Sequence, residues 1–212
     1  MPTLIPKSAF IRALWKNGLG YTDQIAIEPP TADLRLANYL WRISSASITN
    51  ASTFSVFPDH DRVLVILSDT GVRIIHTDDG FEDAQEVPPL EPYEFPGDIQ
   101  SRCELLDGPV KDFSVFFRKG EINATVEVIP LNEETVWKWE PTAHWNFIFS
   151  ARGNFEVCTE DGVTQTLVEG DAFRLDSASN DFSDGIEENL FYPVVSHGNH
   201  SSLISIRLWR QT

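Results

Sequence analysis

An internal repeat is the feature that most constrains the fold of this chain. Residues 71–80 (GVRIIHTDDG) and 153–162 (GNFEVCTEDG) have Gly, Thr, Asp and Gly at the same relative positions, 82 residues apart. At this offset the apolar run 63–67 falls on 145–149. Matching features then follow in both copies: a Gly-Asp pair at 97–98 and 170–171, and alternating runs at 113–117 and 203–208. Because these features recur in the same order, the sequence predicts a duplicated domain.

Each copy has the hydrophobic pattern of β-strands. Apolar and polar residues alternate in short runs, which is the period of a strand with one buried face. Turn dipeptides such as Asp79-Gly80, Asp107-Gly108 and Asp161-Gly162 separate the runs. No segment of helix length shows helical periodicity and caps. We therefore expect an all-β protein, with strands that include 39–43, 62–67, 72–75, 113–117, 124–129, 145–149, 154–157 and 203–208.

The order of strands, Gly turns and a Gly-Asp corner resembles the double-stranded β-helix, or jelly roll, of cupins. Glycine at the corner can adopt the positive φ that a change of sheet requires. Two copies imply a bicupin. We expect a first barrel with the ligand pocket at residues 1–120, a connecting segment at 121–143, and a second barrel at 144–212, packed as one globular unit.

The charge balance narrows the range of partners. Lys and Arg number 16 and Asp and Glu number 32, for a net charge of −16. The electrostatic field of a protein with this negative charge repels nucleic acid and anionic membrane surfaces, so we expect neither as a partner. The chain shows no secretory signal and no run of eighteen apolar residues, which favours a cytoplasmic location. Edge strands and the prevalence of two-fold assemblies favour a homodimer.

Motifs for metal, cofactor or nucleophile chemistry are missing. The five histidines, at positions 60, 76, 144, 197 and 200, include no His-x-His pair of the kind many cupins use to bind a metal. The sequence has no Gly-x-Ser-x-Gly, no P-loop and no dinucleotide-binding glycine motif. We therefore predict no metal, no cofactor and no catalytic residues. General acid–base catalysis stays open, because a single acid in a cavity needs no motif.

Five ordered segments carry a resemblance to a known family. Polar residues lie within aromatic sequence at 15–18 (WKNG), 41–46 (WRISSA) and 54–62 (FSVFPDHDR), followed by 95–98 (FPGD) and 112–114 (DFS). In this order the chain resembles the HutD/Ves family of bicupin-like proteins. It departs from the family pattern at three positions: Gln24 replaces an acid, Asp59 replaces a glycine and Ser114 replaces an asparagine.

The resemblance implies a regulatory rather than a catalytic role. HutD proteins are associated with histidine utilisation, and the resemblance implies binding of a small pathway intermediate such as formylglutamate or urocanate. No enzymatic activity is implied. Two other classes of function stay open: a cupin enzyme that acts on a small acid, with or without metal, and an interaction or scaffold protein without a ligand.

The residues themselves favour an anionic ligand. On a strand at 41–46, Arg42 and Ser44 share one face. If that face is the inner one, they meet Arg62 on a neighbouring strand and offer planar donors to a carboxylate. In the alternative interpretation, Arg42 forms an ion pair with Asp61 or Asp112 that links neighbouring strands and has no role in ligand binding.

Other candidates each have a functional and a structural interpretation. Asn17 and Gly18 would orient a ligand at the barrel mouth or simply form a turn. Trp15 would form a pocket wall or anchor the core. Thr22 would offer its hydroxyl inward. The predicted binding set is Trp15, Asn17, Gly18, Thr22, Arg42, Ser44, Phe57 and Arg62.

Overall fold

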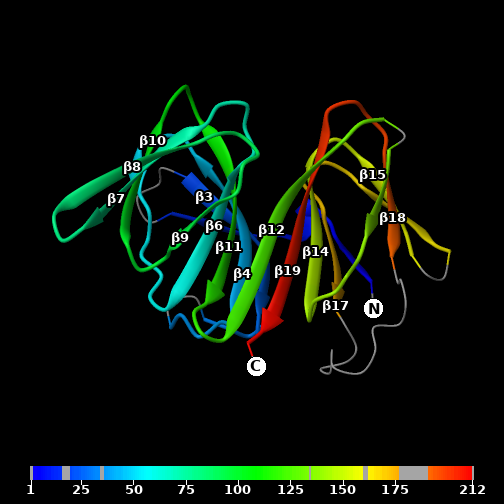
Figure 1. The fold of residues 1–212 in the computed structure, drawn as a ribbon, viewed down its shortest axis with the longest axis horizontal. Helices are drawn as coiled ribbons and strands as arrows, with labels where there is room; N and C mark the ends of the chain where they lie inside the picture. Colours follow the sequence, from blue (N-terminus) through cyan, green and yellow to red (C-terminus); the bar gives the residue numbers. More distant parts are fainter. Residues whose placement is uncertain are drawn as a thin grey trace. The chain divides into compact units, whose positions relative to one another are not determined.

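The computed structural model describes residues 2–15, 20–33, 36–133, 135–159, 162–176 and 191–211. These residues form nineteen β-strands and one short 3₁₀ helix, η1 (Lys7–Ala9). Figure 1 shows the strands as arrows. Among the residues described, no helix is long and apolar enough to cross a membrane. The prediction of an all-β fold is confirmed.

The chain divides into two compact units, each built from two antiparallel sheets. One unit is Phe10–Ile122, and the other combines Met1–Ala9 with Asn123–Thr212. In each unit, alternate strand residues point between its two sheets and pack into a hydrophobic core, so the chain contains two cores.

The first unit is a jelly-roll barrel. In sheet order, its six-stranded sheet contains β2 (Ile11–Leu14), β3 (Gly20–Glu28), β4 (Trp41–Ile48), β11 (Val110–Arg118), β6 (His60–Ile66) and β9 (Tyr93–Pro96). Its four-stranded sheet contains β5 (Ser52–Thr53), β10 (Gln100–Leu105), β7 (Val72–Asp78) and β8 (Phe81–Val87). The buried core between them includes Ile48, Leu64, Ile66, Val72, Ile74 and Phe95.

The second unit repeats this plan. In sheet order, its five-stranded sheet contains β1 (Thr3–Ile5), β17 (Ala172–Asp176), β14 (Trp145–Arg152), β19 (Ser201–Arg210) and β12 (Ile122–Leu131). Its four-stranded sheet contains β13 (Val136–Trp139), β18 (Tyr192–Ser196), β15 (Phe155–Cys158) and β16 (Thr164–Leu167). The core includes Trp139, Ile148, Phe155, Phe173 and Leu203.

Strand order confirms the duplication. The order β4-β11-β6-β9 recurs as β12-β19-β14-β17, and β5-β10-β7-β8 recurs as β13-β18-β15-β16. The register agrees as well. Ile66 lies opposite Asp112, and its counterpart 82 residues later, Ile148, lies opposite Ser205. The two matched turn glycines, Gly80 and Gly162, have φ values of 84° and 78°, a conformation that disfavours residues with a Cβ.

The strand pairing differs from the expected boundaries at two places. Strand β1 pairs with β17 of the second unit, although residues 1–120 were expected to form the first barrel. Residues 121–143, expected as a connecting segment, instead contain all of β12 and all of β13. The alternation in these segments indicated strands, but it carries no information about which sheet edge a strand joins.

Candidate functional site

A polar cluster lies on the core-facing side of the six-stranded sheet in the first barrel. Its members come from three adjacent strands, because alternate residues of β4, β6 and β11 point to the same face. In the register of β4 and β11, Ser44 lies directly opposite Ser114. The exposed fractions of the five residues are only 2 to 6%: Arg42 6%, Ser44 3%, Arg62 5%, Asp112 2% and Ser114 2%.

Arg62 forms the centre of this cluster. Its Nη2 lies 3.2 Å from Oδ2 of Asp112 and donates to Oγ of Ser114 at 2.9 Å, to which Nε also donates at 3.2 Å. Oδ1 of Asp112 accepts a hydrogen bond from the backbone N–H of Ala46 at 2.8 Å. Burial lowers the pKa of Arg62 and raises that of Asp112, while the attraction between the two charges opposes both shifts.

Aromatic rings surround the Arg62 guanidinium. Its Cζ lies 4.2 Å from the ring centre of Phe54, 5.1 Å from that of Phe116 and 5.5 Å from that of Phe95. Such rings attract a cation through their negative faces and exclude water from it. The electrostatic interactions of Arg62 therefore act in a medium of low polarity.

Arg42 lies in the same cluster but has no acidic partner among the described residues. Its one side-chain hydrogen bond runs from Nε to the neutral Oε1 of Gln24 at 3.2 Å, and its Cζ lies 5.8 Å from the ring centre of Phe116. Burial lowers the pKa of its guanidinium. The alternative pairing of Arg42 with Asp61 or Asp112 is wrong, because Asp61 lies 3.5 Å from Lys119 Nζ and Asp112 pairs with Arg62 instead.

The other predicted binding residues lie in three places. Phe57 packs against Phe116, with ring centres 4.4 Å apart, so it lies one ring away from both arginines. Trp15 donates from Nε1 to Oγ1 of Thr22 at 2.9 Å and packs on the barrel core, as the structural interpretation of Trp15 expects. Asn17 and Gly18 lie outside the described residues.

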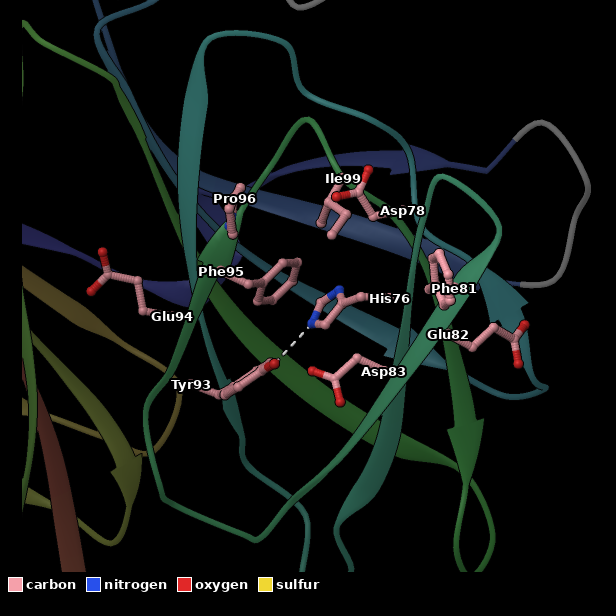
Figure 2. Close-up of a pocket in the computed structure, with 10 residues that line it drawn as sticks. All are labelled: His76, Asp78, Phe81, Glu82, Asp83, Tyr93, Glu94, Phe95, Pro96 and Ile99. Atoms are coloured by element: carbon pink, nitrogen blue, oxygen red, sulfur yellow. Dashed lines mark hydrogen bonds between the residues drawn. The ribbon is translucent and has the colours of Figure 1, made fainter.

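A pocket of about 420 Å³ opens beside this cluster, between β7, β8 and β9 (Figure 2). None of the predicted binding residues lines it. Figure 2 shows His76 from β7 facing Tyr93 and Phe95 from β9, with Asp83 of β8 beside them. Phe95 connects the two features, because its ring lies 4.9 Å from that of His76 and 5.5 Å from Cζ of Arg62. The ring of Phe95 therefore lies between the pocket and Arg62.

The hydrogen bonds of His76 indicate its protonation state. Oγ of Ser101 donates to the backbone oxygen of Ile99 at 3.2 Å, so it accepts from Nδ1 of His76 at 2.8 Å. Nε2 is then the acceptor for the hydroxyl of Tyr93, also at 2.8 Å. Burial lowers the pKa of His76, in agreement with a neutral ring. His76 and Tyr93 together can hold or transfer a proton at the wall of the pocket.

Sequence reasoning named Asp112 only as an alternative partner of Arg42, and it did not place the aromatic residues Phe54, Phe95 and Phe116 around the arginines. Asp112, Ser114 and Phe116 occupy alternate positions of one strand, so strand periodicity alone could have placed them on one face. The rings of Phe54 and Phe95 carry no such signal, because their contact with Arg62 joins distant parts of the chain. Within the described ranges, no group of three His, Cys, Asp or Glu side chains could hold a metal ion.

Comparisons with known proteins agree with this architecture. The HutD family model matches residues 7–188. An uncharacterized 21.2 kDa protein in the hutC 3′ region of Pseudomonas putida is 27% identical over 187 residues, which cover 87% of this chain and 90% of that protein. Protein Ves of Cronobacter sakazakii is 33% identical over 116 residues, covering 54% of this chain and 60% of that protein.

Solved structures show the same fold. HutD from Pseudomonas fluorescens SBW25 has a TM-score of 0.77 with 23% identity, covering 100% of both chains. Vicilin from hazelnut, Corylus avellana, has a TM-score of 0.66 with 7% identity, covering 98% of this chain and 87% of that one. The fold is thus a bicupin of two jelly-roll barrels. Because the HutD family model matches most of its length, the chain belongs to the HutD family.

Proposed function

We propose that this protein binds a small carboxylate metabolite at the arginine cluster of its first barrel, without converting it, and that binding regulates histidine utilisation. The family and the hutC-region relative support the link to this pathway. Formylglutamate and urocanate fit the chemistry of the cluster, because both carry a carboxylate.

The observation that carries the proposal is an uncompensated buried charge. Arg42 and Arg62 contribute two positive charges, and Asp112 contributes one negative charge. Gln24, the hydrogen-bond partner of Arg42, is neutral. A buried charge without a partner carries a desolvation penalty of several kcal/mol, at the level of about 3–5 kcal/mol when one partner of a pair is missing. An anionic ligand would supply the missing negative charge.

The donor set favours a carboxylate. A guanidinium offers parallel N–H groups that match the two oxygens of a carboxylate. Nη1 and Nη2 of Arg42 make no hydrogen bond to any described residue, so they are available as such a pair. The hydroxyl of Ser44 lies on the same strand face, and the ring of Phe116 supplies an apolar wall.

Calorimetric titration with N-formyl-L-glutamate and urocanate tests the proposal. Saturable binding by the wild type, reduced at least tenfold by Arg42→Gln, would support it. The matched control is Arg73→Gln, which removes an exposed arginine paired with Glu86 and should leave affinity unchanged.

Three outcomes would contradict the proposal. The first is the absence of binding to either acid, and the second is equal affinity in folded Arg42→Gln protein. The third is chemical conversion of the bound acid, monitored by NMR over the same period, which would instead favour an enzyme.

A further inference from the structure

The second barrel contains a separate pocket of about 270 Å³. It is lined by residues of β12, β13 and β19 together with Glu140, and all of its lining residues belong to the second unit. The lining includes Trp139 of β13 and Ser205 and Arg207 of β19. This volume is smaller than that of a typical drug-binding pocket, which limits an occupant to roughly the size of an amino acid.

Two buried N–H groups in the pocket lining have no acceptor among the described residues. One is Nε1 of Trp139, whose side chain belongs to a residue only 1% exposed. The other is Nε of Arg207, whose Nη2 already donates to Glu127. Proteins rarely leave buried donors unpaired, because each loses its hydrogen bonds to water without replacement.

Further donors belong to the same pocket. Ser205 is 2% exposed, and its hydroxyl makes no hydrogen bond within the described chain. Lys138 is exposed, and its Nζ lies 4.6 Å from the ring centre of Phe191 rather than beside a carboxylate. The pocket therefore offers an indole N–H, a guanidinium N–H, a hydroxyl and an ammonium group.

The repeat places two of these residues at positions of the first-barrel cluster. Ser205 corresponds to Asp112, because they lie opposite Ile148 and Ile66 respectively. Two residues further along each strand, Arg207 corresponds to Ser114. The buried acid of the first barrel is thus replaced by a neutral hydroxyl, while the two carboxylates that line the second pocket, Glu127 and Glu140, belong to exposed residues.

We infer that this pocket is a second ligand site, which takes a small carboxylate through the N–H groups of Trp139 and Arg207. A carboxylate accepts several hydrogen bonds at once, so one ligand can pair both orphan donors. The carboxylate of Glu140, exposed at the same pocket, can pair with an ammonium group of the ligand. Amino acids carry both groups and suit the volume.

The indole N–H signals in a ¹H–¹⁵N NMR spectrum provide a direct test. The chain has six tryptophans, and the signal of Trp139 is assigned by its loss in Trp139→Phe. Titration with acetate, glycine and L-glutamate should move this signal downfield with saturation. The titration is repeated in Arg42→Gln protein, where the first-barrel site is impaired, so that failure of one site is distinguished from failure of the other.

Two further variants keep the test independent of folding effects at the buried tryptophan. Ser205→Ala removes one donor with little change of volume and should weaken binding at least threefold. Trp209→Phe is the matched control, because its indole N–H donates to the backbone oxygen of Thr142 at 3.3 Å and does not line the pocket. It should leave the affinity unchanged.

The inference is overturned if no carboxylate moves the Trp139 signal with saturation. It is equally overturned if folded Ser205→Ala protein binds as tightly as the protein with Ser205, both measured in the Arg42→Gln background. A response to phosphate or sulfate without any response to carboxylates would overturn the assignment of the ligand class.

Discussion

Arg62 and Asp112 form an ion pair inside the first barrel, with Nη2 3.2 Å from Oδ2 and side chains 6% and 3% exposed. Two hydrogen bonds from Arg62 to Ser114 and one from Ala46 to Asp112 complete the arrangement. Because neither charge has more than slight access to water, each depends on the other, and the change of one residue affects the whole cluster.

Asp112→Asn should therefore destabilise the protein strongly. It leaves two buried guanidinium groups without a negative charge, which typically costs about 3–5 kcal/mol. Glu86→Gln is the control, because it breaks the pair with Arg73, whose side chains are 43% and 62% exposed. That change should cost much less, because exposed ion pairs contribute little to stability. Urea unfolding measures the free energy of unfolding of both variants. Equal decreases would show that the buried pair contributes no more to stability than the exposed one.

Gln24→Glu should stabilise the ligand-free protein and weaken carboxylate binding. The new carboxylate would lie where Oε1 of Gln24 now accepts from Arg42 at 3.2 Å. A hydrogen bond to a charged group contributes about 1.5–3 kcal/mol, which sets the scale of the rise in unfolding free energy. Affinity for N-formyl-L-glutamate should fall at least tenfold in calorimetry. A rise in stability without loss of affinity would show that Arg42 does not bind the ligand.

His76 should make stability fall as the medium becomes acidic. Burial lowers its pKa in the folded state, so the unfolded chain binds the proton more tightly. The contribution of His76 to the free energy of unfolding is fully present above its ordinary pKa of about 6.5. This contribution is lost as the pH falls through the lower pKa of the folded state.

The measurement is the unfolding free energy of wild type and His76→Gln between pH 7.5 and 5. His144 also has a pKa lowered by burial and by Arg210, so the difference between the two proteins isolates His76. That difference should shrink toward low pH. A constant difference would mean that the His76 proton is held equally in both states.

The two cysteines should react differently with iodoacetamide. Cys103 is 1% exposed, and burial raises the pKa of its thiol to about 12, so almost no reactive thiolate forms at pH 8. Cys158 is only partly buried. Mass spectrometry of tryptic peptides should find label on Cys158 in the native protein and on both cysteines in urea. Native labelling of Cys103 would show that the first barrel opens readily.

Fold and duplication were largely predictable because both depend on local patterns. Alternation fixes which residues of a strand are buried, and the repeated turn glycines fix where hairpins reverse, as at Gly80 and Gly162. The pairing of β1 with β17 was not predictable, because three residues at a sheet edge carry too little pattern to identify a partner.

The candidate site was predictable only in part. The grouping of Arg42, Ser44 and Arg62 follows from strand faces and family motifs. Which arginine pairs with Asp112 depends on the register between β6 and β11, where Asp112 lies opposite Ile66 and Phe116 lies opposite Arg62. Register arises from the packing of whole sheets and is not encoded in any short segment.

The pairing of β1 with β17 also sets an order of events during synthesis. Thr3 lies opposite Arg174, so β1 cannot pair with β17 until about 170 further residues have been translated. Until then its backbone groups are an open edge, available to any other strand nearby. During synthesis this strand therefore depends on some other contact to cover its open edge until β17 is made.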